Sequence, residues 1–95
     1  MEPAPTVTIR VSSALRVWSG VTSDVAVPAA SVRAALAEIA ARHPELYRGI
    51  CDETGAIRRH MNLFVNTDHI RDREGLDTAL APGDELTVFP AVSGG

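Results

Sequence analysis

The sequence predicts a single domain of the α+β class, in which a mixed sheet of four to five strands carries one main helix on one face. Three segments support this prediction. Thr6–Val11 and Glu85–Phe89 alternate polar and apolar residues as strands do, and Ser31–Arg42 repeats apolar residues at helical spacing. A chain of 95 residues with 45% hydrophobic content can bury one core. Because a lone helix covers only one face of such a sheet, we expect the other face to stay open.

The N-terminal part is predicted to form a hairpin. Residues 1–5 include two prolines and are expected to be flexible. Thr6–Val11 then forms the first strand, and its core-facing side chains are Val7, Ile9 and Val11. Ser12–Ser23 holds a glycine and several small polar residues, so we expect a long hairpin connection there. It leads to a second short strand at Asp24–Val27.

The main helix is predicted at Ser31–Arg42. Ser31 can cap its first turn, and the stretch is rich in alanine, the strongest helix former. His43 precedes Pro44 and should therefore avoid helical angles, which ends the helix near Arg42. The side chains expected to face the sheet are Val32, Leu36 and Ile39.

The C-terminal half is predicted to complete the sheet. Asn62–Asn66 forms a third strand, His69–Arg71 a brief extended piece and Leu76–Leu80 a short helical turn. A Pro-Gly-Asp turn then introduces the last strand, Glu85–Phe89. The core-facing residues expected from these strands are Leu63, Val65, Leu86 and Val88.

Composition argues against several classes of function. The formal charge is −3, with no strongly basic stretch, which disfavours nucleic-acid binding. No apolar span suits a membrane, and no metal-ligand spacing appears, so neither a membrane nor a metal site is expected. Cys51 is the single cysteine and cannot form an internal disulfide, which fits a reducing cytoplasm. It lies beside Asp52 and Glu53, which would raise its pKa, so a packed or idle thiol is expected rather than a nucleophile.

The end of the chain, APGDELTVFPAVSGG, carries the most specific signal: a tight turn, a strand, a proline and a Gly-Gly terminus. In this ending and in its element order the chain resembles the ubiquitin-like sulfur carriers. These are β-grasp proteins that include the small subunit of molybdopterin synthase and the thiamin-pathway carrier. The NLFVN segment and the loop at Glu45–His60 look most similar to the carriers of actinobacterial cysteine synthesis. The resemblance implies a β-grasp domain at residues 6–90 and a flexible tail at 91–95.

The chemistry of the tail agrees with this resemblance. Ala91–Gly95, fully extended, spans roughly 17 Å at about 3.4 Å per residue, enough to enter a narrow channel in another enzyme. Gly94 and Gly95 have no side chains, which allows a nucleotide and a nucleophile to approach the terminal carboxylate closely. We therefore expect Gly95, with Gly94, to be the reactive site.

The resemblance implies a carrier rather than an enzyme, with no cofactor bound to the chain itself. An E1-like adenylating enzyme, using ATP and Mg²⁺, would activate the Gly95 carboxylate. A sulfide or a persulfide protein would then supply sulfur, and a downstream synthase would accept it from the thiocarboxylate. The acceptor pathway stays open among cysteine, molybdopterin, thiamin and sulfur-containing natural products. Two alternatives are a ubiquitin-like modifier conjugated through the same terminus and a non-covalent interaction domain.

Docking to such partners is expected on the open face of the sheet. Phe64 and Phe89 lie opposite the core-facing positions of their strands, where an exposed apolar patch commonly marks a partner site. His69 is predicted to join them, and Pro90 and Val92 complete the predicted docking set. The alternative is that the Ser12–Ser23 connection, with its Trp18, folds over the two rings.

Overall fold

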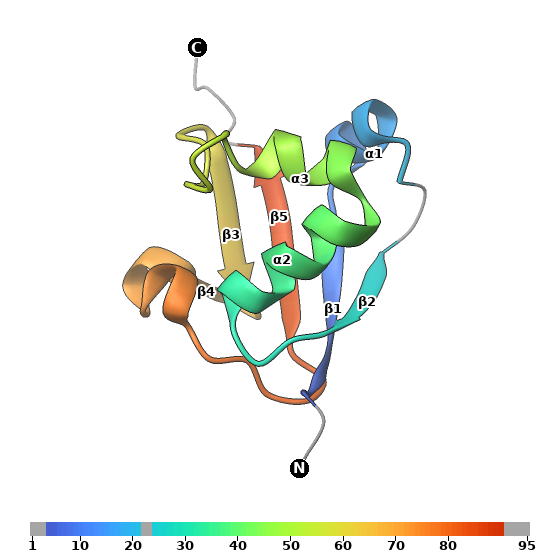
Figure 1. Ribbon diagram of the computed structural model, residues 1–95. Coiled ribbons are helices and arrows are strands. Elements are labelled where there is room, and N and C mark those ends of the chain that lie inside the picture. Colours follow the sequence, from blue (N-terminus) through green and yellow to red (C-terminus); the bar gives the residue numbers. More distant parts are fainter. Residues whose placement is uncertain (1–3, 22–23, 91–95) are drawn as a thin grey trace.

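The computed structural model describes residues 4–21 and 24–90, apart from the side chain of Trp18, and contains a five-stranded mixed sheet (Figure 1). The strand order is β2-β1-β5-β3-β4. The first and last strands, β1 and β5, pair in parallel at the centre, and every other neighbouring pair is antiparallel. The strands are β1 (Thr6–Val11), β2 (Val25–Pro28), β3 (Met61–Val65), β4 (Asp68–His69) and β5 (Glu85–Pro90).

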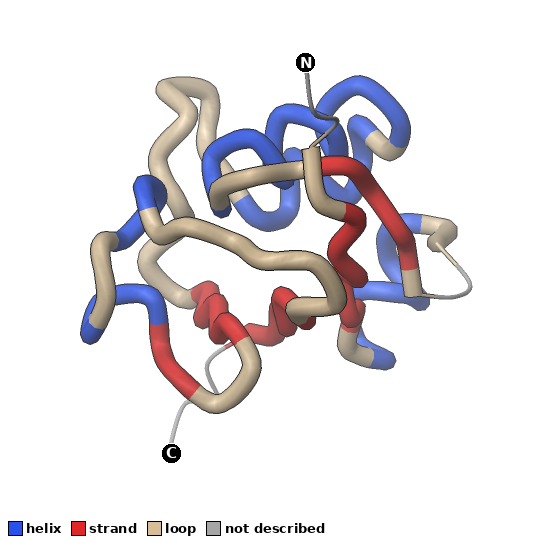
Figure 2. The backbone as a smooth tube through the Cα atoms, turned by 90° about the horizontal axis from the view of Figure 1, so that it is seen from below, coloured by secondary structure: helices blue, strands red, loops and turns tan. Residues whose placement is uncertain are grey.

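The longest helix, α2 (Val32–Arg42), lies across one face of this sheet, and the end-on view in Figure 2 shows the strands as a layer with this helix on one side. The side chain of Ser31 accepts a hydrogen bond from the backbone N–H of Ala34, as predicted for a capping residue. The helix ends at Arg42, also as predicted. The mixed sheet and the main helix across one of its faces form the β-grasp arrangement that the resemblance implies.

The core forms between α2 and the inner face of the sheet. All ten side chains that the sequence assigns to the core in α2, β1, β3 and β5 are buried. Leu46 and Ile50, from the segment after α2, are also fully buried and close the core at one end. Because every other residue of each central strand points inward, the alternate residues of the same strands are left facing out.

The Ser12–Ser23 segment is not simply a hairpin connection, because it contains the helix α1 (Ser13–Ser19). The Ser12 hydroxyl accepts from the backbone N–H of Leu15, and Gly20 ends the helix in the left-handed conformation that glycine tolerates best. Leu15 is buried, so the helix is fixed by the core rather than by its own apolar periodicity. The prediction missed it because one buried side chain gives no repeat.

A second short helix, α3 (Pro44–Ile50), follows α2 directly. Pro44 ends α2 as predicted, but it also occupies the first turn of α3, where its missing N–H costs nothing. Farther along, the extended piece predicted at His69–Arg71 is shorter than expected, because β4 ends at His69 and a 3₁₀ turn follows at Ile70–Asp72. A second 3₁₀ turn, Gly75–Asp77, overlaps the start of the helical turn predicted at Leu76–Leu80, and the remainder of that segment is not helical.

The two ends of the described chain lie at opposite ends of the sheet (Figure 1). Pro90, the last residue of β5, is paired with Met61, the first residue of β3. α1 and α3 contact each other near this same end of the central strands. Within residues 4–21 and 24–90, no helix has the length and apolar character needed to cross a membrane.

Candidate functional site: the open sheet face and the end of the last strand

Three rings gather on the face of the sheet that α2 leaves open, and we call Phe64, His69 and Phe89 the aromatic patch. The rings of Phe64 and Phe89 are stacked, with centroids 5.4 Å apart and planes inclined by 15°. His69 meets Phe64 edge-on at 5.0 Å. All three side chains are half-buried. β3 and β5 are neighbours in the sheet, so both phenylalanines lie on its open face, as expected.

The imidazole of His69 is held on both of its nitrogens. The backbone N–H of Arg71 donates to Nδ1 at 3.1 Å, so the ring proton belongs on Nε2, which lies 3.1 Å from Oδ1 of Asn62. The guanidinium of Arg71 lies against the same ring, with Nη2 3.1 Å from Nε2. Asn62 and Arg71 therefore fix the edge of the patch, although the sequence analysis gave neither a role.

Beside the two phenylalanines the open face is slightly hollowed, with a volume of about 360 Å³, and Asn66, Thr67 and Thr87 form the rest of its lining. Asn66 adopts a left-handed backbone conformation, with φ of 55°, which asparagine tolerates better than most residues. Its side-chain amide donates to Asp84 and its side-chain carbonyl accepts from the backbone N–H of Glu85. This hollow is therefore apolar at its centre and rigid at its rim.

The alternative cover for the patch, the Ser12–Ser23 segment, lies elsewhere in the residues that are described. α1 stands beside α3 at the end of the sheet, and its Leu15 points into the core on the helix side. The side chain of Trp18 lies outside the described residues. Val92, Gly94 and Gly95, which the sequence analysis assigned to docking and to the reactive site, also lie outside them.

Pro90 does not share the open face with Phe89. It continues the inward-facing row of Leu86 and Val88, because alternate residues of a strand point to opposite faces. At the end of the sheet Pro90 lines a hollow of about 430 Å³ between α1, α3 and the segment before β3, which we call the strand-end pocket. Its other lining residues include Leu15, Gly49, Arg58, His60 and Met61.

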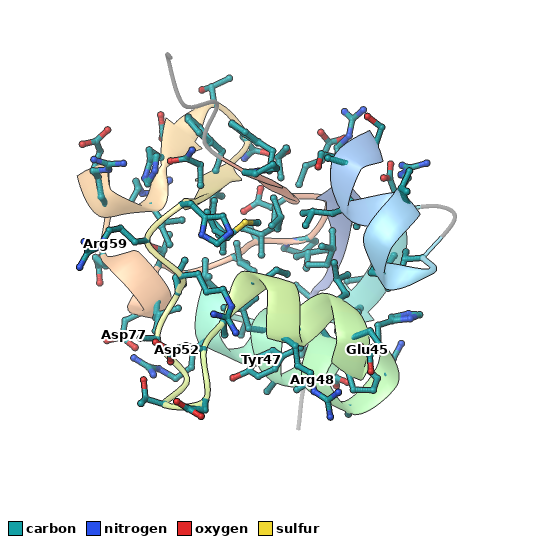
Figure 3. The ribbon with its side chains drawn as sticks, turned by 90° about the horizontal axis from the view of Figure 1, so that it is seen from above. Glu45, Tyr47, Arg48, Asp52, Arg59 and Asp77 are labelled. Carbon is teal, nitrogen blue, oxygen red and sulfur yellow. The ribbon has the colours of Figure 1, made fainter. Side chains whose placement is uncertain are left out.

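Charged groups surround the strand-end pocket, and Figure 3 looks down on this end of the molecule. Glu45 and Arg48 lie together on α3, with Arg48 Nη1 3.0 Å from Glu45 Oε1. Arg58 donates from Nε to the backbone carbonyl of Arg48 at 2.7 Å. This pocket is not predictable without α1 and α3, and neither helix was expected from the sequence. The available signals were the Ser12 and Gly20 caps and Pro44 at the start of a helix.

Cys51 is 2% exposed, as expected of a packed thiol. Burial raises its pKa above the ordinary value, although the hydroxyl of Tyr47 lowers it in part. A thiol at such a site is a weak nucleophile near neutral pH. In the part of the chain that the structure describes, no three histidine, cysteine, aspartate or glutamate side chains come together to hold a metal ion.

Comparison with known proteins connects this geometry to a family. Residues 10–95 match the ThiS family. The sulfur carrier protein CysO of Mycobacterium tuberculosis is 31% identical over 91 residues, covering 94% of this chain and 98% of its own. Among solved structures, small archaeal modifier protein 1 of Methanosarcina acetivorans superposes with a TM-score of 0.82 at 29% identity, covering both chains completely. The BexX/CysO complex of Amycolatopsis orientalis superposes with a TM-score of 0.81 at 30% identity, covering 94% of this chain and 99% of the other.

Proposed function

The chain belongs to the ThiS family, and we propose that it is a sulfur carrier whose Gly95 carboxylate is converted into a thiocarboxylate by partner enzymes. The observation that carries the proposal is the family match, which runs through the last strand to Gly95. A relative named as a sulfur carrier aligns over nearly the whole of both chains and supports it. The protein would supply a reactive terminus and a docking surface, and its partners would supply the catalytic groups.

The proposed activation takes place in two steps. A Gly95 carboxylate oxygen attacks the α-phosphorus of ATP, pyrophosphate leaves, and an acyl-adenylate remains; Mg²⁺ in the partner enzyme would offset the phosphate charge. Sulfide then attacks the acyl carbon, and the C–O bond to AMP breaks. A persulfide donor would instead leave an acyl disulfide, which a thiol must reduce to release the thiocarboxylate. Glycine suits both steps because it leaves the acyl carbon unshielded.

The aromatic patch is the proposed docking site for the adenylating enzyme. Its two stacked rings offer an apolar surface that is half-exposed, and aromatic residues are enriched at protein interfaces. His69 adds a polar edge that Asn62 and Arg71 hold in place. The BexX/CysO complex supports docking in general, since it shows a similar chain assembled with another protein.

A protein modifier is the second candidate function, because a small archaeal modifier protein is also similar to this chain over its full length. The chemistry is shared up to the acyl-adenylate, and a target amine then replaces the sulfur nucleophile. The chain has nine arginines and no lysine, so it cannot form lysine-linked chains on itself. It could still be attached singly to other proteins.

The two candidates are separated by incubation with the adenylating enzyme of the same organism, ATP and a sulfide source, followed by intact-protein mass spectrometry. A carrier exchanges one oxygen for sulfur at its terminus. Chains that lack Gly94 and Gly95, or that carry one residue after Gly95, should remain unconverted and are the controls. Amide adducts on other proteins without any sulfur gain would favour the modifier. If the adenylating enzyme is shown to form acyl-adenylates on another carrier protein, but this chain gains no sulfur and forms no amide adduct, both candidates are refuted.

A further inference from the structure

The strand-end pocket lies at the end of β5, where an enzyme has to bind in order to reach the residues after Pro90. Pro90 lines the pocket, and Met61, its partner in the sheet, forms part of the same lining. Residues 91–95 follow directly. An enzyme that encloses these residues would therefore cover the end of β5, and with it the mouth of this pocket. The aromatic patch, by contrast, lies on the other face of the sheet.

The lining combines an apolar floor with an arginine at its rim, Arg58, that forms no salt bridge among the described residues. Leu15 and Met61 are nearly buried and form the floor together with Pro90. Six of the nine arginines form a salt bridge with a carboxylate among the described residues, and Arg58 is not one of them. Its Nε is fixed to the carbonyl of Arg48, which holds the guanidinium in place.

No carboxylate of the pocket lining pairs with Arg58, although its charge acts at longer range on Asp52, which lies outside the lining and accepts hydrogen bonds from Thr54. In the described part of the chain, Glu45 is the acidic residue of the lining, and its carboxylate is engaged with Arg48 at 3.0 Å. His60 is exposed at the rim and also lacks a carboxylate within salt-bridge distance among the described residues. The guanidinium of Arg58 is therefore free to form a salt bridge with an incoming carboxylate, although the protein carries a formal charge of −3.

We propose that the strand-end pocket is a second docking site, which receives a segment of the adenylating enzyme that carries an aspartate or glutamate next to an apolar side chain. The apolar side chain would pack on Leu15 and Met61, and the carboxylate would pair with Arg58 at the rim. This inference rests on the proposed function. It adds a contact that orients the end of β5 on the enzyme, whereas the aromatic patch holds the opposite face.

The first turn of α1 offers a matched pair of variants for the test. Ala14 lines the pocket and Ser13 does not, and both are exposed residues at the start of the same helix. A14E and S13E each add one carboxylate near the helix N-terminus, where negative charge is tolerated. Only the A14E carboxylate would occupy the pocket beside Arg58. H60E adds the same charge at the rim from another element.

Affinity for the adenylating enzyme of the same organism is measured by calorimetry with the full chain at 50 mM and 200 mM NaCl. We expect A14E and H60E to weaken binding at least about fivefold at the lower salt concentration, because each sets a carboxylate against the incoming one. S13E should stay within about twofold of the parent. The parent should lose affinity with added salt, and A14E should lose less, because its pocket charge is already neutralised.

The proposal is overturned if A14E and H60E bind like the parent, if S13E weakens binding equally, or if A14E binds more tightly, which would indicate a basic occupant. Urea unfolding of each variant confirms that the fold is kept. Conversion by saturating enzyme is followed by mass spectrometry in the same proteins. If the parent gains sulfur and the pocket variants bind normally, only the second docking site fails. If the parent never gains sulfur, the carrier function fails.

Discussion

Replacing Phe89 with aspartate should separate docking from folding. Phe89 is half-buried and stacked on Phe64 at 5.4 Å, so part of its ring already contributes to the fold. Loss of the stacking alone should cost roughly 0.5–1.5 kcal/mol of unfolding free energy. A bound partner would bury the rest of the ring, and a central aromatic at an interface is typically worth at least about 2 kcal/mol. That corresponds to roughly a 30-fold loss of affinity.

The matched control is A26D. Ala26 is exposed and lies on the same open face, paired with Thr8 at the β2 edge of the sheet. The A26D substitution therefore adds the same charge as F89D but away from the aromatic patch. Affinity for the adenylating enzyme is measured by calorimetry and stability by urea unfolding. We expect F89D to lose about 30-fold in affinity and A26D to stay within about twofold. Equal losses, or an unchanged affinity for F89D, would refute docking at the patch.

Three further predictions concern stability and chemistry. L36A should lower the free energy of unfolding by about 2–5 kcal/mol, because Leu36 is 4% exposed on the sheet-facing side of α2; a loss within error in urea unfolding would show that Leu36 does not belong to the core. Hydrogen bonds from the Ala81 backbone and then from Asn66 lower the pKa of Asp84. The contribution of the ionised Asp84 to stability should therefore be complete above the unfolded pKa of about 3.9 and be lost as the pH falls through the lower folded pKa. The difference in unfolding free energy between the parent and D84A should narrow in acid, and a difference that is the same at neutral pH and in acid would contradict this. C51A should gain sulfur as the parent does, since the buried Cys51 thiol takes no part in the proposed chemistry; a folded C51A that cannot be converted in the mass-spectrometric assay would show otherwise.

The regular elements could be predicted because their patterns are long enough to exceed chance. β1 alternates over six residues, and α2 has a cap, an alanine-rich body and a proline after its end. The open face follows from the same alternation, which is why Phe64 and Phe89 were placed together correctly. What the sequence does not show is which strands are neighbours, and here the resemblance to a known fold was needed.

The strand-end pocket was beyond prediction for a physical reason. α1 and α3 have seven residues each, and isolated helices of that length are unstable in water. They form because Leu15, Leu46 and Ile50 reach a core that other segments build, so their local sequence carries little of the information. Pro44 illustrates the difficulty, since one residue both ends α2 and starts α3. A pocket between two such helices could not be located before the helices were known.

The central place of β5 has a mechanical consequence. β5 is hydrogen-bonded along both sides, in parallel to β1 and antiparallel to β3. A force applied along the chain beyond Pro90 would therefore act along both rows of bonds at once and load them in shear, instead of opening them one after another from an edge. An enzyme that pulls on the C-terminal end of this chain would have to break the β1–β5 and β3–β5 hydrogen bonds together before β5 could leave the sheet. The position of β5 between two strands therefore predicts that the domain stays folded when its C-terminal end is pulled.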